Sequence, residues 1–327
     1  MQHLITGGAG FIGSHLADAL VGRGHAVMIL DDLSTGRREN IDDLLADGKA
    51  ELTVGSADDG TLVNDLMASA DVCFHLASSV GVELIVDQPL ESVLRTVRST
   101  DTVMSAANHH RTRLVFTSTS EVYGKSNGEP LREDADRTVG PPTRSRWSYS
   151  TAKVFGEILA YGYTRDRGAK MTVARLFNSV GPRQSGAYGM VLPRFVEQAL
   201  AGDDLTVYGT GGQSRCFTHV YDTVDALVKL ARTERSIGNV YNIGAAVPIT
   251  ILGLANRVLE RTGSESQVRL VPYAEAYGEG FEELGSRRPD CSAIERLIGW
   301  RPTRDVDDAI DDLIATRSSP RAHRVVA

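Results

Sequence analysis

The sequence predicts an α/β protein built on a Rossmann-type, doubly wound parallel sheet, with a smaller C-terminal α/β domain. Short apolar runs alternate with segments of helical spacing through the first half of the chain, which is typical of strands joined by crossover helices in a parallel sheet. A glycine-rich turn follows the first apolar run. Small and hydroxyl-bearing residues follow several later runs, at the carboxyl ends where such sheets bind ligands.

The composition fits a protein with a full hydrophobic core and no nucleic-acid partner. Its 327 residues are 42% hydrophobic and 24% charged, which suits one large α/β domain or two modest ones. The formal net charge of -7 argues against nucleic-acid binding, because that function usually requires a basic face.

The cysteines and the hydropathy pattern favour a cytoplasmic location. Cys73, Cys216 and Cys291 lack CxxC spacing, so they predict neither a disulfide framework nor a zinc site, and we expect no bound metal. The chain opens directly on a strand, without the features of a signal peptide. Since no apolar run approaches membrane-spanning length, we expect no membrane partner and a reducing environment.

The glycine-rich turn predicts a dinucleotide site. Residues 2–6 form the first predicted strand and residues 14–22 the first helix, with a GxxGxxG pattern between them. In such a turn Gly7 permits the tight bend, Gly10 lets the backbone approach a pyrophosphate, and Gly13 lets helix and strand pack closely. The helix N-terminus then presents N–H groups to the phosphates. The alternative is a glycine-rich turn without a ligand, and the next strand weakens it.

That next strand ends in an acid pair. Residues 26–30 lead into Asp31 and Asp32, about 20 residues after the glycines, where an acid holds the adenosine ribose 2′-hydroxyl. An acid also repels a 2′-phosphate, so NAD is favoured over NADP. Arg37 and Arg38 follow closely and keep NADP open at this point.

Two further segments of the sequence are expected to meet over this site. A predicted strand at residues 114–118 runs into Ser118, Thr119 and Ser120, whose hydroxyls are suited to hold a substrate oxygen. Tyr149 and Lys153 are four residues apart, so on a helix they share one face. An ammonium group beside the phenol would lower the tyrosine pKa and make it a general base. Such pairs also occur by chance, and the position near the strand ends favours catalysis.

The motifs taken together resemble one family. TGGAGFIGSH, the acid pair, HLAS, TSTSEVYG and YSTAK occur in the order seen in the extended short-chain dehydrogenase/reductase family of nucleotide-sugar epimerases, dehydratases and decarboxylases. The resemblance covers about residues 1–312. It implies an NAD-binding domain at residues 1–178, to which 217–249 return, and a mainly nucleotide-sugar-binding domain at 179–327. It also implies a homodimer, held by a four-helix bundle of residues 90–107 and 149–165.

The resemblance assigns roles to individual residues. Tyr149 is the implied base, Lys153 orients the nicotinamide ribose, and Thr119 or Ser120 binds the C4 oxygen of the sugar. The implied NAD-binding residues are Gly7, Gly10, Phe11, Ile12, Gly13, Asp31, Asp32, Ser34, Thr35, Gly36, Ser56, Ala57, Leu76, Ala77, Ser78, Tyr149 and Lys153. The implied substrate-binding residues are Val80, Thr119, Ser120, Asn178, Arg183, Val191, Leu192, Tyr208, Arg215, Arg287 and Asp290. One departure is Thr96, which stands where the family often has an asparagine in an N-x-x-G-T pattern.

The family shares oxidation at C4, and what happens to the 4-keto sugar separates its members. The chain has Thr119-Ser120-Glu121 where 4,6-dehydratases have Thr-Asp-Glu, which counts against dehydration. Together with residues 146–149 and 277–289 this resembles the UDP-glucuronate branch, where Glu121 and Arg287 would act near the substrate carboxylate. We predict a 4-epimerase that converts UDP-glucuronic to UDP-galacturonic acid. UDP-glucuronic acid decarboxylation is the alternative, followed by a dehydratase, a non-catalytic dinucleotide sensor and a simple reductase.

Overall fold

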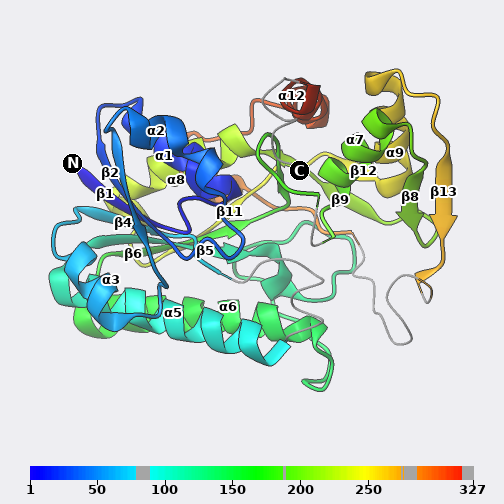
Figure 1. The fold of residues 1–327 in the computed structure, drawn as a ribbon. Coiled ribbons are helices and arrows are strands. Elements are labelled where there is room, and N and C mark those ends of the chain that lie inside the picture. The colour runs from blue at the N-terminus through cyan, green and yellow to red at the C-terminus, as the bar shows by residue number, and fades with distance from the viewer. Residues whose placement is uncertain (79–88, 187–188, 274, 276–285, 319–327) are drawn as a thin grey trace.

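The computed structural model describes residues 1–78, 89–186, 189–273, 275 and 286–318. Its centre is a parallel sheet of seven strands in the order β11-β6-β5-β4-β1-β2-β3 (Figure 1). The strands are β1 (Gln2–Thr6), β2 (Ala26–Asp31), β3 (Ala50–Val54), β4 (Val72–His75), β5 (Arg113–Thr119), β6 (Met171–Leu176) and β11 (Val240–Ile243). The prediction of a Rossmann-type doubly wound fold is confirmed.

Helices cover both faces of this sheet. On one face lie α1 (Phe11–Val21), α2 (Asp42–Ala46), α8 (Val220–Ala231) and α11 (Ser292–Ile298). On the other lie α3 (Gly60–Met67), α5 (Pro89–His110) and α6 (Arg146–Arg167), and Figure 1 shows α5 and α6 side by side along the sheet. Each face has its own apolar core, with Leu16 and Ile29 in one and Met104 and Phe116 in the other. Because both faces are covered, the central strands are apolar almost throughout, as parallel strands require.

Local sequence signals set the helix boundaries. Asp59 precedes α3 and accepts hydrogen bonds from the backbone N–H groups of Thr61 and Leu62, as an N-cap does. Gly168 ends α6 in the left-handed conformation, with φ of 66°, which a glycine adopts at low cost. The sequence has helical spacing from Ile249 to Arg261, but the helix here, α9 (Ile251–Thr262), begins two residues later. Pro248–Thr250 forms β12 against β9 (Ser214–Cys216), and this pairing overrides the helical spacing.

A smaller group of elements lies beside the carboxyl ends of the main sheet, at the right of Figure 1. It contains α7 (Val191–Ala201), β8 (Leu205–Tyr208), α9 (Ile251–Thr262), β13 (Val268–Val271) and α12 (Val306–Ser318). Two short pairs, β7 (Ser179–Val180) with β10 (Thr218–His219) and β9 with β12, connect it to the sheet. Its core includes Leu192, Phe195 and Ile310. β11, which lies within residues 217–249, pairs with β6 of the main sheet. The domain boundary at residue 178 and the return of residues 217–249 to the first domain stay a prediction.

None of the helices in the described part of the chain is long and apolar enough to cross a membrane.

His75, at the end of β4, is a buried polar group at the centre of the fold. Its ring has no exposed surface, and Nδ1 lies 2.7 Å from Thr6 Oγ1 while Nε2 lies 3.4 Å from Thr100 Oγ1. Burial, and secondly the charge of Lys153, lowers the pKa of His75 from 6.5 to about 3. The folded protein therefore keeps this imidazole neutral under conditions where the unfolded chain protonates it.

We expect this difference in pKa to make stability depend on pH. The contribution is complete above pH 6.5, the pKa of the free imidazole, and is lost as the pH falls from there toward 3. Unfolding free energy should fall by about 1.4 kcal/mol per pH unit from this group. Urea denaturation of wild type and His75→Asn at several pH values measures the difference in slope. The exposed His109→Asn is the control, and equal slopes for wild type and His75→Asn would contradict the assignment.

The outer faces of α5 and α6 carry apolar side chains in solvent. Ile158 is 63% exposed and Tyr161 58% on α6, and Leu90 is 66% exposed on α5. We propose that these helices from two copies form the four-helix bundle of a homodimer. Ile158→Asp should then yield monomers in sedimentation velocity, because the charge would be desolvated in the interface. Val247→Asp, which replaces another exposed apolar residue just before β12 and away from α5 and α6, should leave the dimer intact. Unchanged sedimentation of Ile158→Asp would refute the bundle.

Candidate active site

A cavity of about 650 Å³ opens at the carboxyl ends of the parallel strands and continues into the smaller group. With two exceptions, every residue predicted to bind cofactor or substrate lines it. Val80 lies outside the described residues. Asp290 does not line the cavity, and its carboxylate instead accepts a hydrogen bond of 2.8 Å from the Ser292 N–H. The Asp290 side chain thus serves the start of α11, and its part in substrate binding stays a prediction.

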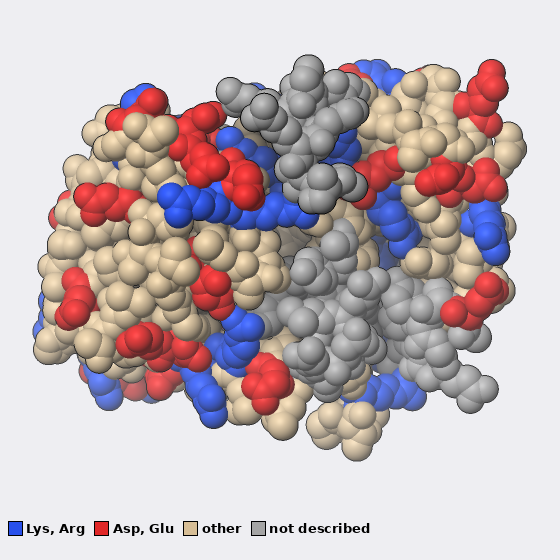
Figure 2. Space-filling view, viewed as in Figure 1, with Lys and Arg blue, Asp and Glu red and all other residues tan. Residues whose placement is uncertain are grey.

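The cavity is cationic in a protein of net negative charge. Its described lining includes the basic residues Arg37, Arg95, Lys153, Arg183, Arg194, Arg215 and Arg287. The acidic ones are Asp31, Asp32 and Glu121. Figure 2 shows a row of Lys and Arg side chains from the left to the centre of the face that it presents, next to Asp and Glu side chains. An excess of positive charge in a concave site favours an anionic ligand such as a diphosphate.

The glycine turn brings the start of α1 against the ends of β1 and β4. Gly7 has φ of 75°, and a Cβ there would lie 2.8 Å from the Ala77 nitrogen. A Cβ on Gly13 would overlap the Gly7 carbonyl oxygen and the Gly8 Cα. Both positions therefore require glycine, which leaves backbone N–H groups at the N-terminus of α1 facing the cavity. This close approach suits a pyrophosphate.

The acid pair divides into two environments. Asp31 is buried and accepts hydrogen bonds of 2.9 Å from the N–H groups of Ala9 and Leu33, and burial raises its pKa. Asp32 forms an ion pair with Arg95 of α5 and accepts a hydrogen bond of 3.0 Å from the Ser34 N–H. Asp31 thus holds the glycine turn and the following loop together, while still lining the cavity. Arg95 was not predicted, because nothing in the helix pattern links it to a loop about 60 residues earlier.

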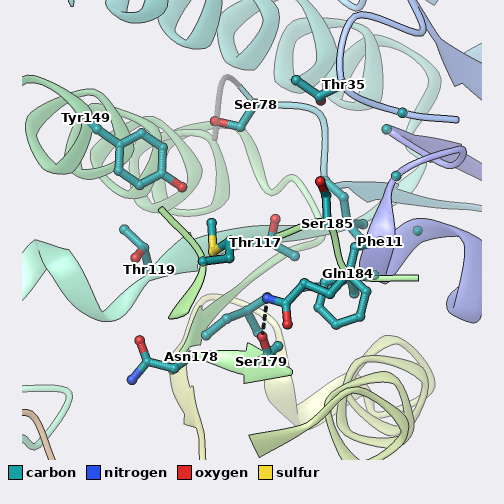
Figure 3. A pocket seen from close by; sticks show the side chains of 18 of the residues that line it. Phe11, Thr35, Ser78, Thr117, Thr119, Tyr149, Asn178, Ser179, Gln184 and Ser185 are labelled. Carbon is teal, nitrogen blue, oxygen red and sulfur yellow. Dashed lines mark hydrogen bonds between the residues drawn. The ribbon is translucent and has the colours of Figure 1, made fainter. Parts of the chain in front are cut away.

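Tyr149 and Thr119 lie around the same part of the cavity, with Ser78 nearby (Figure 3). Tyr149 is buried, and burial raises its pKa, with a further rise from the Glu121 carboxylate and an opposing hydrogen bond from Ser78. In the chain by itself the Tyr149 pKa thus lies above its usual value, which is opposite to the predicted direction. Burial also lowers the pKa of Lys153 to about 7. Its Nζ donates to the Thr117 carbonyl at 3.0 Å and lies 5.9 Å from the Tyr149 ring centre, too far to offset the burial.

The end of β5 turns into a short 3₁₀ helix, η2 (Ser120–Tyr123), and presents Thr119 and Glu121 to the cavity. Thr119 Oγ1 accepts a hydrogen bond of 3.2 Å from the Glu121 N–H, so its own hydroxyl proton is available to a substrate oxygen. Glu121 Oε1 lies 3.5 Å from Nη1 of Arg287, which is buried. Arg287 forms an isolated bridge with Arg215. The Glu121–Arg287 pair therefore lies close to Tyr149, whose pKa the Glu121 carboxylate raises.

Other predicted substrate residues lie at the junction with the smaller group. Asn178 donates from Nδ2 to the Cys216 carbonyl at 3.0 Å. Arg183 pairs with Asp18 of α1 at 2.7 Å. Tyr208 packs against the guanidinium of Arg194, whose carbon is 4.5 Å from the ring centre. Figure 3 shows Gln184 and Ser185 beside Phe11, away from Tyr149. Further lining residues that the motifs did not single out are Arg95, Ser99, Gln184, Ser185, Arg194, Gln213 and Tyr273.

The fold, the glycine turn and the cationic cavity define a dinucleotide-binding protein of the Rossmann class. The chain belongs to the NAD dependent epimerase/dehydratase family, whose model matches residues 3–244. NAD is accordingly its cofactor, and a nucleotide sugar its substrate class.

Several proteins of known name are similar to the chain over nearly its whole length. The chain is 38% identical over 312 residues to the UDP-N-acetyl-alpha-D-glucosaminuronate decarboxylase of Bacillus cytotoxicus, covering 95% of this chain and 96% of that protein. It is 33% identical over 321 residues to UDP-glucuronic acid decarboxylase 1 of Danio rerio, covering 98% and 73%. The crystal structure of UDP-glucuronic acid 4-epimerase from Bacillus cereus, with UDP-glucuronic acid and NAD, aligns with a TM-score of 0.85. That alignment covers 97% of this chain and 98% of the epimerase at 26% identity.

The glycine turn yields a direct test of the cofactor site. Gly13→Ala should weaken NAD binding about tenfold or more, because the new methyl group displaces the turn from the pyrophosphate position. Isothermal titration calorimetry with NAD measures the affinity. Gly60→Ala, at the first residue of α3, is the matched control, because its Cβ would meet no atom within 4 Å. Equal NAD affinity for Gly13→Ala and wild type would show that the turn does not shape the site.

Proposed function

We propose that the chain is an NAD-dependent UDP-uronic acid decarboxylase. The observation that carries the proposal is the Glu121–Arg287 pair beside Tyr149 and Thr119, in a chain whose relatives in Bacillus cytotoxicus and Danio rerio are both uronic acid decarboxylases. The sequence alone favoured 4-epimerisation, with decarboxylation as the alternative. The relatives support the alternative better, and we adopt it here.

In the first step Tyr149 takes the proton of the C4 hydroxyl. NAD, when bound, supplies the hydride acceptor for C4 and returns the hydride at the end of the cycle. Thr119 already accepts a hydrogen bond from the Glu121 N–H, and it donates its hydroxyl proton to the C4 oxygen. Positive charge in the assembled site favours the phenolate, and the basic lining of the cavity holds the diphosphate. These groups favour the developing charge on oxygen through preorganised hydrogen bonds.

In the second step the C4 ketone stands β to the carboxylate. The C5–C6 bond breaks, carbon dioxide leaves, and the electron pair moves onto the C4 oxygen held by Tyr149 and Thr119. C5 takes a proton from solvent in place of the lost carboxyl group, and Tyr149 gives its proton back to the C4 oxygen when the hydride returns to C4. Arg287 recognises the carboxylate, because a guanidinium suits this anion. Glu121 partly neutralises Arg287, so the carboxylate is oriented without being held too strongly to leave.

Epimerisation is the second candidate, supported by the similarity to the Bacillus cereus 4-epimerase. It requires the ketone to turn over in the cavity while the carboxylate is kept. The two functions share the residues of C4 oxidation and differ in what Arg287 and Glu121 do to the substrate carboxylate. Product analysis therefore separates them directly.

The decisive experiment gives purified protein and NAD either UDP-glucuronic acid or its 2-acetamido counterpart. We expect carbon dioxide and the corresponding UDP-pentose from at least one of them. Arg287→Lys should lower kcat by about tenfold or more, because lysine loses the planar fork that orients a carboxylate. Arg288→Lys is the matched control, since Arg288 is exposed and outside the cavity lining. Formation of UDP-galacturonic acid without carbon dioxide would refute decarboxylation and establish the epimerase.

A further inference from the structure

A row of buried polar side chains begins beneath the catalytic helix. Arg175 of β6 forms a two-pronged ion pair with Glu157 of α6, with Nε–Oε1 and Nη2–Oε2 distances of 2.9 and 2.7 Å. The two side chains are only 8% and 10% exposed. Ser118 of β5, which lines the cavity, donates its hydroxyl to Glu157 Oε1 at 2.5 Å. This pair thus joins two central strands to the helix that carries the predicted base.

Glu157 lies on the same face of α6 as the catalytic pair. Tyr149, Lys153 and Glu157 follow one another at intervals of four residues, which places them in one row on a helix. The Glu157 carboxylate also counteracts the effect of burial on the pKa of Lys153. The oxidation half of the site is therefore anchored to Arg175 through α6.

From Arg175 the hydrogen bonds continue away from α6. Arg175 Nη1 donates to the Tyr123 hydroxyl at 2.9 Å, and Tyr123 donates to Asn242 Oδ1 at 2.7 Å. Asn242 Nδ2 donates to two carbonyls, of Leu131 at 2.8 Å and of Asp290 at 3.1 Å. Tyr123 and Asn242 are both fully buried. Each polar atom used here is thus matched within the protein, as buried polar groups require.

The two carbonyls that Asn242 holds belong to the segment that carries Arg287. The Leu131 N–H donates to the Arg288 carbonyl at 2.8 Å, and the Asp290 N–H donates to the Leu131 carbonyl at 2.9 Å. Residues 287–290 are therefore tied to the loop at Leu131, and both are tied to Asn242. Arg287 stands at the start of this segment, in the cavity.

We propose that Tyr123 and Asn242 are positioning residues for the loss of carbon dioxide, in that they hold the Arg287 segment in register with the Tyr149 site on α6. The inference rests on the proposed function, because it assigns Arg287 to the carboxylate. Tyr149, Lys153 and Thr119 are placed by α6 and by the backbone pairing of β5 with β6, and not by the Tyr123 hydroxyl. Arg175 keeps both bonds to Glu157 when that hydroxyl is lost, so the loss affects the carboxylate end of the site and spares the oxidation end.

Tyr123→Phe tests this with a minimal change. The aromatic ring stays beneath the Arg175 guanidinium, whose carbon is 4.7 Å from the ring centre, while Asn242 and Arg175 each lose a partner. We expect carbon dioxide release from the UDP-uronate to slow about tenfold to hundredfold, as a misplacement of about 1 Å does. Formation of reduced nicotinamide in a single turnover should change by less than about threefold. Reduced cofactor should therefore accumulate in the variant and not in wild type.

Tyr241→Phe is the matched control. It removes the same kind of hydroxyl from the buried residue next to Asn242 on β11, outside this row of hydrogen bonds. The ratio of the rates of nicotinamide reduction and carbon dioxide release, which we call the partition, should stay at the wild-type value. Asn242→Ala is a second variant, which should shift the partition in the same direction as Tyr123→Phe. Thermal melts identify the variants that fold.

Two outcomes overturn the positioning role: equal slowing of both steps in the folded variants, or an unchanged partition. Absence of carbon dioxide release by the wild-type protein would instead refute the proposed function. The folded variants therefore test the positioning role, whereas the wild-type protein tests the proposed function.

Discussion

The register between β5 and β6 is the constraint on which the site depends. Ser118 lies opposite Arg175, and Thr119 opposite Leu176. Ser118 and Arg175 therefore reach the same Glu157 carboxylate, while Thr119 ends the strand in the cavity. A slip of one residue would turn Arg175 to the other face of the sheet and leave Glu157 without its cation. Because a buried unpaired carboxylate is strongly disfavoured, the ion pair selects the register that also places the catalytic hydroxyl.

Burial governs the proton affinities around Tyr149. It raises the pKa of the phenol and lowers that of Lys153 to about 7, so by itself the chain favours the neutral form of each group. A strong base at this position is thus not a property of the Tyr–Lys spacing alone. It requires positive charge brought near the phenol in the assembled site, which is consistent with a cavity whose lining is mainly basic. The same burial strengthens each hydrogen bond inside the cavity, because the local dielectric constant is low.

The sequence predicted the parts of this protein that have local signatures. The glycine turn, the strand ends and the Tyr149–Lys153 row are visible because each depends on residues a few positions apart. The pairing of Asp32 with Arg95, the use of Asp290 at the start of α11 and the β12 strand at Pro248–Thr250 were missed or misassigned. The ion pair and the strand pairing each depend on a partner that is distant in the chain, which no local pattern reveals, whereas Asp290 bonds to Ser292 two residues on. The sign of the Tyr149 pKa shift was wrong for a related reason, since spacing shows a neighbour but not the depth of burial.

The opposing charges of Glu121 and Arg287 bear on why one fold serves both epimerases and decarboxylases. A lone buried arginine would hold a uronate carboxylate firmly, and that ground-state attraction would be lost as carbon dioxide forms, which raises the barrier. An arginine already paired with a carboxylate gives less of this attraction and still fixes the direction of approach. Under the proposed function the substrate carboxylate would also lie near the Glu121 charge, and the repulsion between them would be relieved when carbon dioxide leaves. The geometry of one pair, held in place through Tyr123 and Asn242, can thus direct a shared 4-keto intermediate toward loss of its carboxylate.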